Sequence, residues 1–84
     1  MQIADKSLLS RITSNPQILT GKPVIRDLRI PVDLILELLA KGASFAEILE
    51  DYPDLEPADI QAALFYTYHL VTLEHHVHPA SPIT

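Results

Sequence analysis

The chain has no cysteine and no tryptophan, and only two glycines among its 84 residues. The absence of cysteine excludes disulfides and thiolate metal sites, which is typical of a reducing cytoplasm, where we expect the protein to reside. A phosphate-binding loop is excluded for two reasons. Gly42 is the only glycine besides Gly21, and Gly21-Lys22 is followed by Pro23 where that loop needs Ser or Thr. No apolar run approaches the roughly 18 residues of a membrane span, so we expect a soluble protein with no membrane partner.

Positive charge is missing from the second half of the sequence. Residues 1–41 hold all six Lys and Arg and four acidic residues, a net charge of +2. Residues 42–84 hold seven acidic residues and no base, a net charge of −7. An acidic surface attracts basic partners and repels nucleic acid, whereas a basic segment does the opposite, so the two halves are expected to face different partners.

The length predicts one domain, preceded by a flexible segment at 1–10 and followed by a flexible tail at 77–84. We expect residues 11–31 to form a short β-ribbon. Its second half lies between two prolines. Pro23 and Pro31 each restrict φ and push the preceding residue toward extended geometry. The intervening residues 24–30 therefore predict a short hairpin that presents Arg26 and Arg29.

Three helices are predicted after the ribbon, at 32–41, 44–52 and 57–76. Gly42 ends the first helix, and Ser44 with Glu47 three residues later is a capping box that starts the second. Pro57 suits a first helical position, and Asp59 complements the positive end of the third helix. The fold class is therefore mainly α, a three-helix bundle of helix-turn-helix type with an N-terminal β-ribbon, while a plain three-helix bundle remains an alternative.

The third helix is apolar on more than one side. We expect one stripe to enter the core, formed by Ile60, Ala63, Leu64, Thr67 and Val71. A second stripe is predicted either to lie under the ribbon or to form a homodimer or partner interface, and it comprises Phe65, Tyr66, His69 and Leu73.

A DNA-binding function would depend on residues outside the third helix. A helix in the major groove normally brings Lys or Arg, and this one offers Gln61 as a polar contact but no base. Phosphate contacts would come from the basic residues of the first half, doubled in a dimer, namely Arg11, Lys22, Arg26, Arg29 and Lys41. Alternatively, Arg26 and Arg29 form surface ion pairs with Asp27, Asp33 or Glu37.

No constellation of catalytic residues is evident, so no enzyme, cofactor or small-molecule substrate is expected. Histidines gather near the C-terminus, at His69, His75, His76 and His78. Histidines in a last helical turn suit the helix dipole, and no acidic or thiol ligand completes a metal set. A metal-responsive module is therefore the weakest of the alternatives.

Several motifs in their order and spacing resemble the small prokaryotic family DUF433. They are Arg11-Ile12-Thr13, Pro16-Gln17-Ile18, Gly21 to Arg26, Arg29 to Val32, Gly42-Ala43-Ser44 and Glu47 to Pro53. The resemblance implies a homeodomain-like helix-turn-helix fold, similar to VapB-type antitoxins that are often encoded beside a PIN-like ribonuclease toxin. The family usually has Gly-Thr where this chain has Asp27-Leu28, so we expect a reshaped hairpin tip in place of a tight II′ turn. Glu56 also replaces the usual Thr or Ser before the third helix, which leaves Asp59 to compensate.

The sequence thus predicts a non-enzymatic, homodimeric, antitoxin-like protein that binds its own promoter DNA and a PIN-like ribonuclease toxin. The alternative is a protein–protein adaptor that keeps the helix-turn-helix fold but does not bind DNA.

Overall fold

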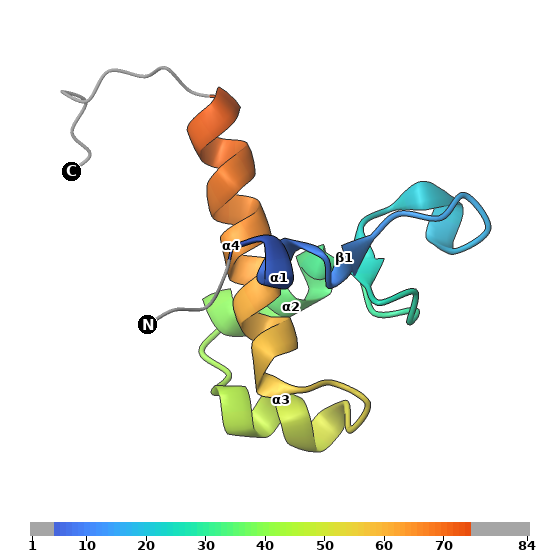
Figure 1. The fold of residues 1–84 in the computed structure, drawn as a ribbon. Coiled ribbons are helices and arrows are strands. Elements are labelled where there is room, and N and C mark those ends of the chain that lie inside the picture. Colours follow the sequence, from blue (N-terminus) through green and yellow to red (C-terminus); the bar gives the residue numbers. More distant parts are fainter. Residues whose placement is uncertain (1–4, 75–84) are drawn as a thin grey trace, which may run out of the picture.

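The computed structural model describes residues 5–74, and its elements are mainly helical (Figure 1). In chain order they are α1 (Asp5–Leu9), β1 (Ile12–Thr13), the 3-10 helix η1 (Leu19–Gly21), β2 (Val24–Ile25), α2 (Val32–Ala40), α3 (Phe45–Asp51) and α4 (Pro57–Glu74). The predicted mainly α fold with a short β-ribbon is confirmed. The tail at 77–84 and the last two residues of the predicted third helix lie outside the described residues.

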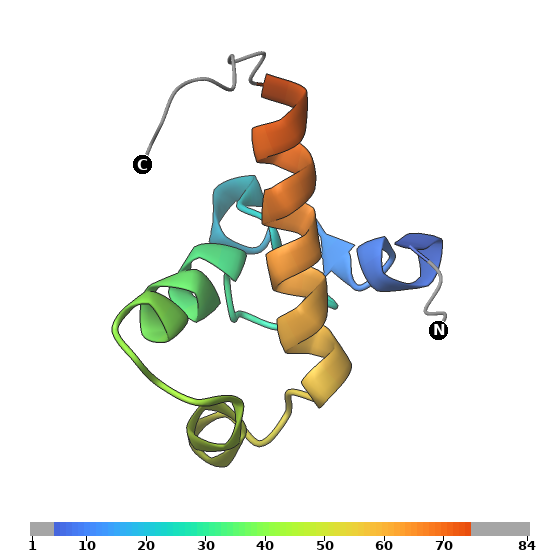
Figure 2. The same cartoon turned by 90° about the vertical axis from the view of Figure 1, so that its left-hand side faces the viewer.

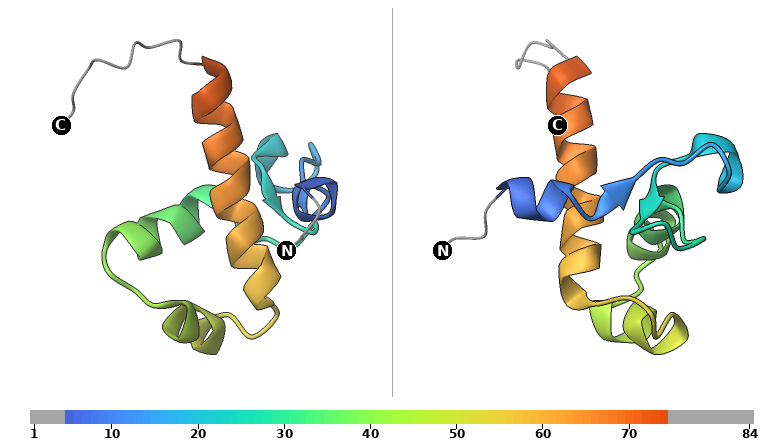
Figure 3. Two further views of the ribbon diagram at one scale, coloured as in Figure 1. Left: turned by 60° about the vertical axis from the view of Figure 1, so that its left-hand side comes forward. Right: turned by 45° about the vertical axis from the view of Figure 1, so that its right-hand side comes forward.

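The segment predicted to be flexible at the N-terminus contains a helix. α1 covers residues 5–9, and the backbone N–H of Arg11 donates to the carbonyl of Leu8 at 3.0 Å as the helix ends. α1 packs against α4, as the views in Figures 2 and 3 show. A segment of five residues is too short to be helical alone, so its docking through apolar side chains such as Leu8 explains its order.

The ribbon is formed by β1 and β2, which pair antiparallel with Ile12 opposite Ile25 and Thr13 opposite Val24. The chain after β2 folds back onto this strand, and the Ile25 N–H donates a hydrogen bond to the carbonyl of Ile30 at 3.1 Å. Val24 forms an isolated bridge with Pro31, which closes the predicted hairpin.

The hairpin tip is reshaped, as expected, and is not a II′ turn. Its central residues are Arg26 and Asp27, with φ of 45° and 59°, and Leu28 N–H donates to the carbonyl of Ile25 at 2.7 Å. Two left-handed central residues define a type I′ turn, and Asp is among the residues that tolerate this conformation. Thr13 supports the turn, since its hydroxyl donates to Asp27 Oδ1 at 2.7 Å and accepts from the Asp27 N–H at 2.9 Å.

The three predicted helices begin and end close to the predicted residues, because local capping signals specify their ends. α2 ends in a Schellman motif, in which Ala43 N–H donates to the Leu38 carbonyl and Gly42, at φ +100°, donates to the Leu39 carbonyl. α3 begins with the predicted capping box between Ser44 and Glu47. The chain then turns and enters α4, and α3 lies across the foot of this helix (Figure 1).

The hydrophobic core joins the ribbon to all three of these helices. Its buried members are Ile25, Val32, Ile35, Ile48, Leu55, Ile60 and Ala63. The predicted core stripe of α4 is correct at Ile60 and Ala63 but wrong at Leu64 and Val71, which are 41% and 55% exposed. For Val71 the reason is visible in Figure 1, where the C-terminal half of α4 extends beyond the other described elements. Leu64 lies in the N-terminal half of α4 and lines a shallow groove with Leu8.

None of the helices between residues 5 and 74 combines the length and apolarity needed to cross a lipid bilayer.

Candidate functional site: an ionic cluster and the exposed surface of α4

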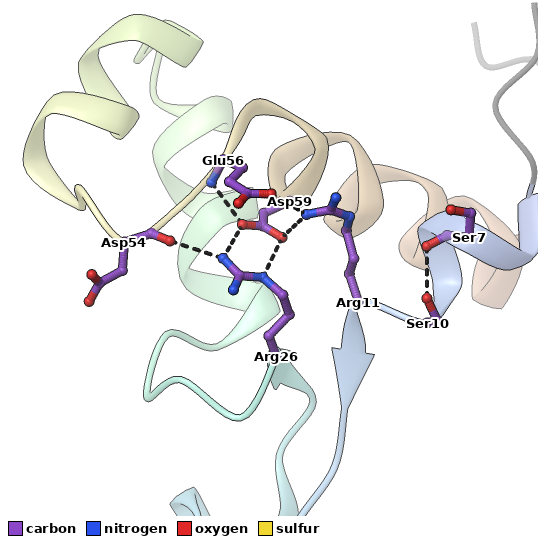
Figure 4. Close-up of polar contacts among 7 residues, drawn as sticks. All are labelled: Ser7, Ser10, Arg11, Arg26, Asp54, Glu56 and Asp59. Carbon is purple, nitrogen blue, oxygen red and sulfur yellow. Dashed lines mark hydrogen bonds and ion pairs between the residues drawn. The ribbon is translucent and has the colours of Figure 1, made fainter.

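A buried carboxylate, Asp59, holds the ribbon against the helices (Figure 4). Its side chain is fully buried and accepts four hydrogen bonds. Arg26 donates through Nε to Oδ1 at 3.0 Å and through Nη2 to Oδ2 at 2.8 Å. Arg11 Nη1 donates to Oδ1 at 2.9 Å, and the backbone N–H of Glu56 donates to Oδ2 at 2.8 Å. This arrangement, the Asp59 cluster, consists of Arg11, Arg26, Glu56 and Asp59.

The cluster connects three elements that are far apart in the sequence. Arg11 immediately precedes β1, Arg26 lies in the turn after β2, and Asp59 is in the first turn of α4. Arg11 also contacts Glu56 Oε1 at 2.8 Å, and Arg26 Nη2 donates to the backbone carbonyl of Asp54 at 2.9 Å. Asp59 was expected to compensate for Glu56 at the N-terminal end of α4. This is confirmed, because the Asp59 carboxylate accepts a hydrogen bond from the Glu56 backbone N–H.

The charged forms of Asp59, Arg11 and Arg26 are favoured. Burial raises the pKa of Asp59, but hydrogen bonds from Arg26, the Glu56 backbone and Arg11 outweigh it, so its pKa lies below the ordinary value. The pKa of Arg11 is raised by its hydrogen bonds to Glu56 and Asp59, and that of Arg26 by its bonds to Asp59. At neutral pH the cluster therefore contains a carboxylate held by two guanidinium groups.

The basic residues expected to contact DNA do not form one surface dedicated to phosphate. Arg11 and Arg26 are bound to Asp59, with 28% and 37% of their side chains exposed. Lys22 Nζ lies 2.9 Å from Asp33 Oδ2, and Lys41 Nζ lies 2.8 Å from Glu37 Oε2. Arg29 is exposed and takes part in none of the ion pairs found within residues 5–74.

The ion pairs expected for the arginines involve different partners. Asp33 and Glu37 pair with lysines, and Asp27 hydrogen-bonds to Thr13. Arg26 instead binds a carboxylate 33 positions later in the chain. Sequence spacing gave no signal for this contact, because it depends on how the ribbon folds onto α4.

Two grooves run along α4, on different sides of it. The first has a volume of about 330 Å³ and lies between α1 and α4, with lining residues Leu8, Gln61, Leu64, Phe65 and Tyr68. Gln61, the predicted base contact, thus lies beside α1. The second has a volume of about 200 Å³ and is lined by Lys22, Pro23, Val32, Asp33, Leu36, Tyr66, Thr67 and Leu70. Its lining is mostly apolar, and the Lys22–Asp33 ion pair contributes polar atoms to it.

The four residues predicted for a partner interface differ in how far they are buried. Tyr66 packs against the core, whereas Leu73 is 68% exposed. The ring of Phe65 lies 6.0 Å from that of Tyr68 and 5.6 Å from that of His69, measured between centroids. The sequence interpretation missed Leu64, Tyr68, Leu70 and Val71 as exposed apolar side chains, although their three- and four-residue spacings were available in the sequence.

Among the described residues no group of three or more His, Asp or Glu side chains is placed to hold a metal ion. Three of the four histidines, His75, His76 and His78, lie outside the described part of the chain.

These elements define a small, mainly α domain of helix-turn-helix type whose ribbon is fixed to the helices by an ionic cluster. A family model described as "Protein of unknown function (DUF433)" matches residues 12–67, more than half of the sequence, and the chain belongs to this family.

Two relatives place the chain among proteins of similar sequence and fold. It is 40% identical over 55 residues to the uncharacterized protein y4eO of Sinorhizobium fredii, a match that covers 66% of this chain and 25% of that protein. It also resembles the crystal structure of a DUF433 member from Anabaena variabilis, with a TM-score of 0.63, 30% identity, and coverage of 82% of this chain and 64% of that one. The chain thus spans a quarter of the length of the curated relative.

Proposed function

We propose that this chain is a non-enzymatic binding module of antitoxin type, whose partner is a PIN-like ribonuclease toxin. The observation that carries the proposal is the exposed apolar surface on the C-terminal half of α4. Leu70, four residues after Tyr66, lines the second groove, and Leu73, seven residues after Tyr66, continues the same side of α4 and is 68% exposed. We call Tyr66, Leu70 and Leu73 the inner seam.

The inner seam suits a protein partner better than any other class of ligand. Exposed apolar side chains that continue a groove are typical of protein interfaces. The charge of the chain gives a further reason, because Glu47, Glu50 and Asp51 of α3 are all exposed and residues 42–73 contain no base. A nuclease that binds RNA presents positive charge to phosphates, so an acidic module is complementary to it.

The residues of the grooves support a binding role over catalysis. Lys22 and Asp33 neutralise each other, and the Thr67 hydroxyl donates to the Ala63 carbonyl at 2.9 Å. These polar groups are occupied by contacts within the protein, so we assign no catalytic residue, cofactor or small-molecule substrate. A partner of a bacterial ribonuclease acts in the cytoplasm, and we place the chain there.

Co-purification with any nuclease encoded beside this chain tests the proposal. We expect the wild-type chain to copurify with the nuclease and the Leu73→Glu variant to lose the complex, since a charge would be buried at the inner seam. Tyr68→Glu is the matched control, because Tyr68 is exposed to a similar degree but lies on another side of α4. Absence of a complex with the wild-type chain, or equal binding by both variants, would contradict the assignment.

Promoter DNA is a second candidate ligand, supported by Arg29. This side chain is exposed on the ribbon without an ion-pair partner among the described residues, and Lys22 on the same ribbon is 49% exposed. Phosphate contact through Arg29 predicts that Arg29→Ala lowers both the affinity and the salt dependence of binding, while Arg29→Lys retains most of both. Gel-shift titration over a range of salt concentrations measures this, and a flat salt response would leave the adaptor function as the better account.

A further inference from the structure

A second apolar seam lies on the side of α4 that faces away from α2. Its members are Gln61, Leu64, Tyr68 and Val71, which we call the outer seam. The intervals between them are three, four and three residues, the spacing of a and d positions in a coiled coil. Leu64, Tyr68 and Val71 are among the exposed large apolar residues of the chain, and Tyr68 is 62% exposed.

The outer seam lacks charge, as the inner seam of the same helix does, so the acidic residues that favour a basic partner lie on α3 and on neither seam. Between Pro57 and Leu73 the only Asp, Glu, Lys or Arg is Asp59, and that side chain is buried in the Asp59 cluster. A strongly basic or acidic macromolecule would gain no electrostatic attraction here. A second copy of the same helix meets an uncharged, apolar surface like its own, without repulsion between like charges.

We propose that the outer seam is the contact between two copies of this chain, with the two α4 helices antiparallel. In this pairing Leu64 of one copy lies opposite Tyr68 of the other, and Gln61 lies opposite Val71, so the contact is the same for both copies. Three members of the outer seam, Gln61, Leu64 and Tyr68, line the groove of about 330 Å³ whose other wall is Leu8 of α1, so the second helix docks into this groove alongside α1. Phe65, at the border of this groove, extends the contact.

Charge at the ends of α4 decides the orientation. Glu47, Glu50 and Asp51 of α3, with Asp54 and Glu56, lie at the N-terminal end of α4 and are exposed. A parallel pair would bring two such acidic ends together, whereas an antiparallel pair places them at opposite ends of the contact. The helix dipoles also favour the antiparallel arrangement. This inference does not depend on the toxin partner proposed above, because that partner is assigned to the inner seam.

Sedimentation equilibrium on the full chain tests the dimer. We expect the wild-type chain to be a dimer and Tyr68→Glu to be a monomer with unchanged helical circular dichroism. Leu73→Glu is the matched control and should remain a dimer, since Leu73 is exposed at 68% but belongs to the inner seam. A wild-type chain that stays monomeric at its highest soluble concentration would overturn the inference. So would loss of the dimer in Leu73→Glu but not in Tyr68→Glu, which would move the contact between copies to the inner seam.

Introduced cysteines test the orientation, since the native chain has none. In an antiparallel pair Leu64 faces Tyr68 of the second copy, whereas two Leu64 residues are offset by four positions, about 6 Å along the axis. Equimolar Leu64→Cys and Tyr68→Cys chains, mixed and then oxidised, should therefore cross-link mainly between unlike chains. Cross-linking mainly between like chains would indicate a parallel pair and would overturn the antiparallel assignment.

Discussion

At the scale of single residues, Asp59 has the largest structural role. A buried carboxylate is costly unless its oxygens are fully bonded, and here both oxygens accept from Arg26 while Arg11 and the Glu56 N–H complete the set. Removing one partner of such a group typically costs about 3–5 kcal/mol when both charges are buried. Both arginines are partly exposed, so a smaller loss is expected for either of them than for Asp59.

The first prediction concerns Asp59→Asn and its dependence on pH. At pH 7 we expect this variant to lower the free energy of unfolding by about 2–4 kcal/mol, because two guanidinium groups lose their buried counterion. The pKa of Asp59 is lower in the folded than in the unfolded protein, so the unfolded state binds more protons in acid. The stabilisation is thus complete above the unfolded pKa of about 3.9 and disappears as the pH falls through the folded pKa.

Urea unfolding from pH 7 down to pH 2 measures this difference. The gap between wild type and Asp59→Asn should be constant above about pH 5 and should narrow below about pH 4. Asp27→Asn is the control, since it changes an exposed carboxylate and keeps an oxygen for Thr13. Its effect should stay within about 0.5 kcal/mol. A pH-independent gap for Asp59→Asn would show that the carboxylate charge is not what stabilises the cluster.

The roles of Arg11 and Arg26 illustrate what sequence reasoning misses at this scale. Both were predicted to contact phosphate because they are basic and lie on a stiff ribbon. Their bond to Asp59 spans 48 and 33 positions, and no periodicity or local motif encodes a contact at that separation. By contrast, the role of Asp59 in the first turn of α4 was predicted, since helix-end effects act within a few residues.

At the scale of elements, helix ends were the most predictable feature. The capping box at Ser44 and the glycine stop at Gly42 depend on residues within five positions, so the sequence contains all the information needed. The buried face of α4 was less predictable, because its apolar residues surround the helix. Which of them are buried depends on which other elements pack against α4, and the sequence pattern of α4 does not contain that information.

The second prediction tests the capping box. Ser44→Ala removes the hydroxyl that accepts from the Glu47 N–H at 3.1 Å, and it should lower the free energy of unfolding by about 1 kcal/mol. Glu50→Ala, an exposed substitution within the same helix, should change it by less than about 0.5 kcal/mol. Thermal and urea unfolding of both variants measure these values. Equal effects of the two substitutions would argue that the cap does not limit the stability of α3.

At the scale of the whole molecule, the order and type of the main elements were predicted, and their assembly was only partly predicted. α1 was expected to be flexible because five residues give no helical signal, and its order comes from α4. The second stripe of α4 was expected either to lie under the ribbon or to form an interface. Tyr66 packs against the core while Leu73 remains exposed, so burial accounts for only part of this stripe and the interface stays a prediction. Contacts between distant segments decide both results.

The third prediction concerns the dependence of the three larger helices on the ribbon. A helix-turn-helix unit made of α2, α3 and α4 would ordinarily be expected to fold alone, but here Val24 and Ile25 of the ribbon are fully buried and Arg26 neutralises Asp59. A chain of residues 32–84 loses those apolar contacts and leaves a buried carboxylate without a counterion. We expect it to show no cooperative thermal transition by circular dichroism, whereas the full chain melts cooperatively.

A variant of this shorter chain separates the two causes. Asp59→Asn in residues 32–84 removes the unpaired charge but does not restore Val24 and Ile25, so we expect only a small gain in helicity and still no cooperative transition. Cooperative folding of this variant alone would assign the dependence to the charge and not to the core. Cooperative melting of the unmodified 32–84 chain near the melting temperature of the full protein would contradict this prediction. The three helices would then fold independently, and the ribbon would be available to bind a partner.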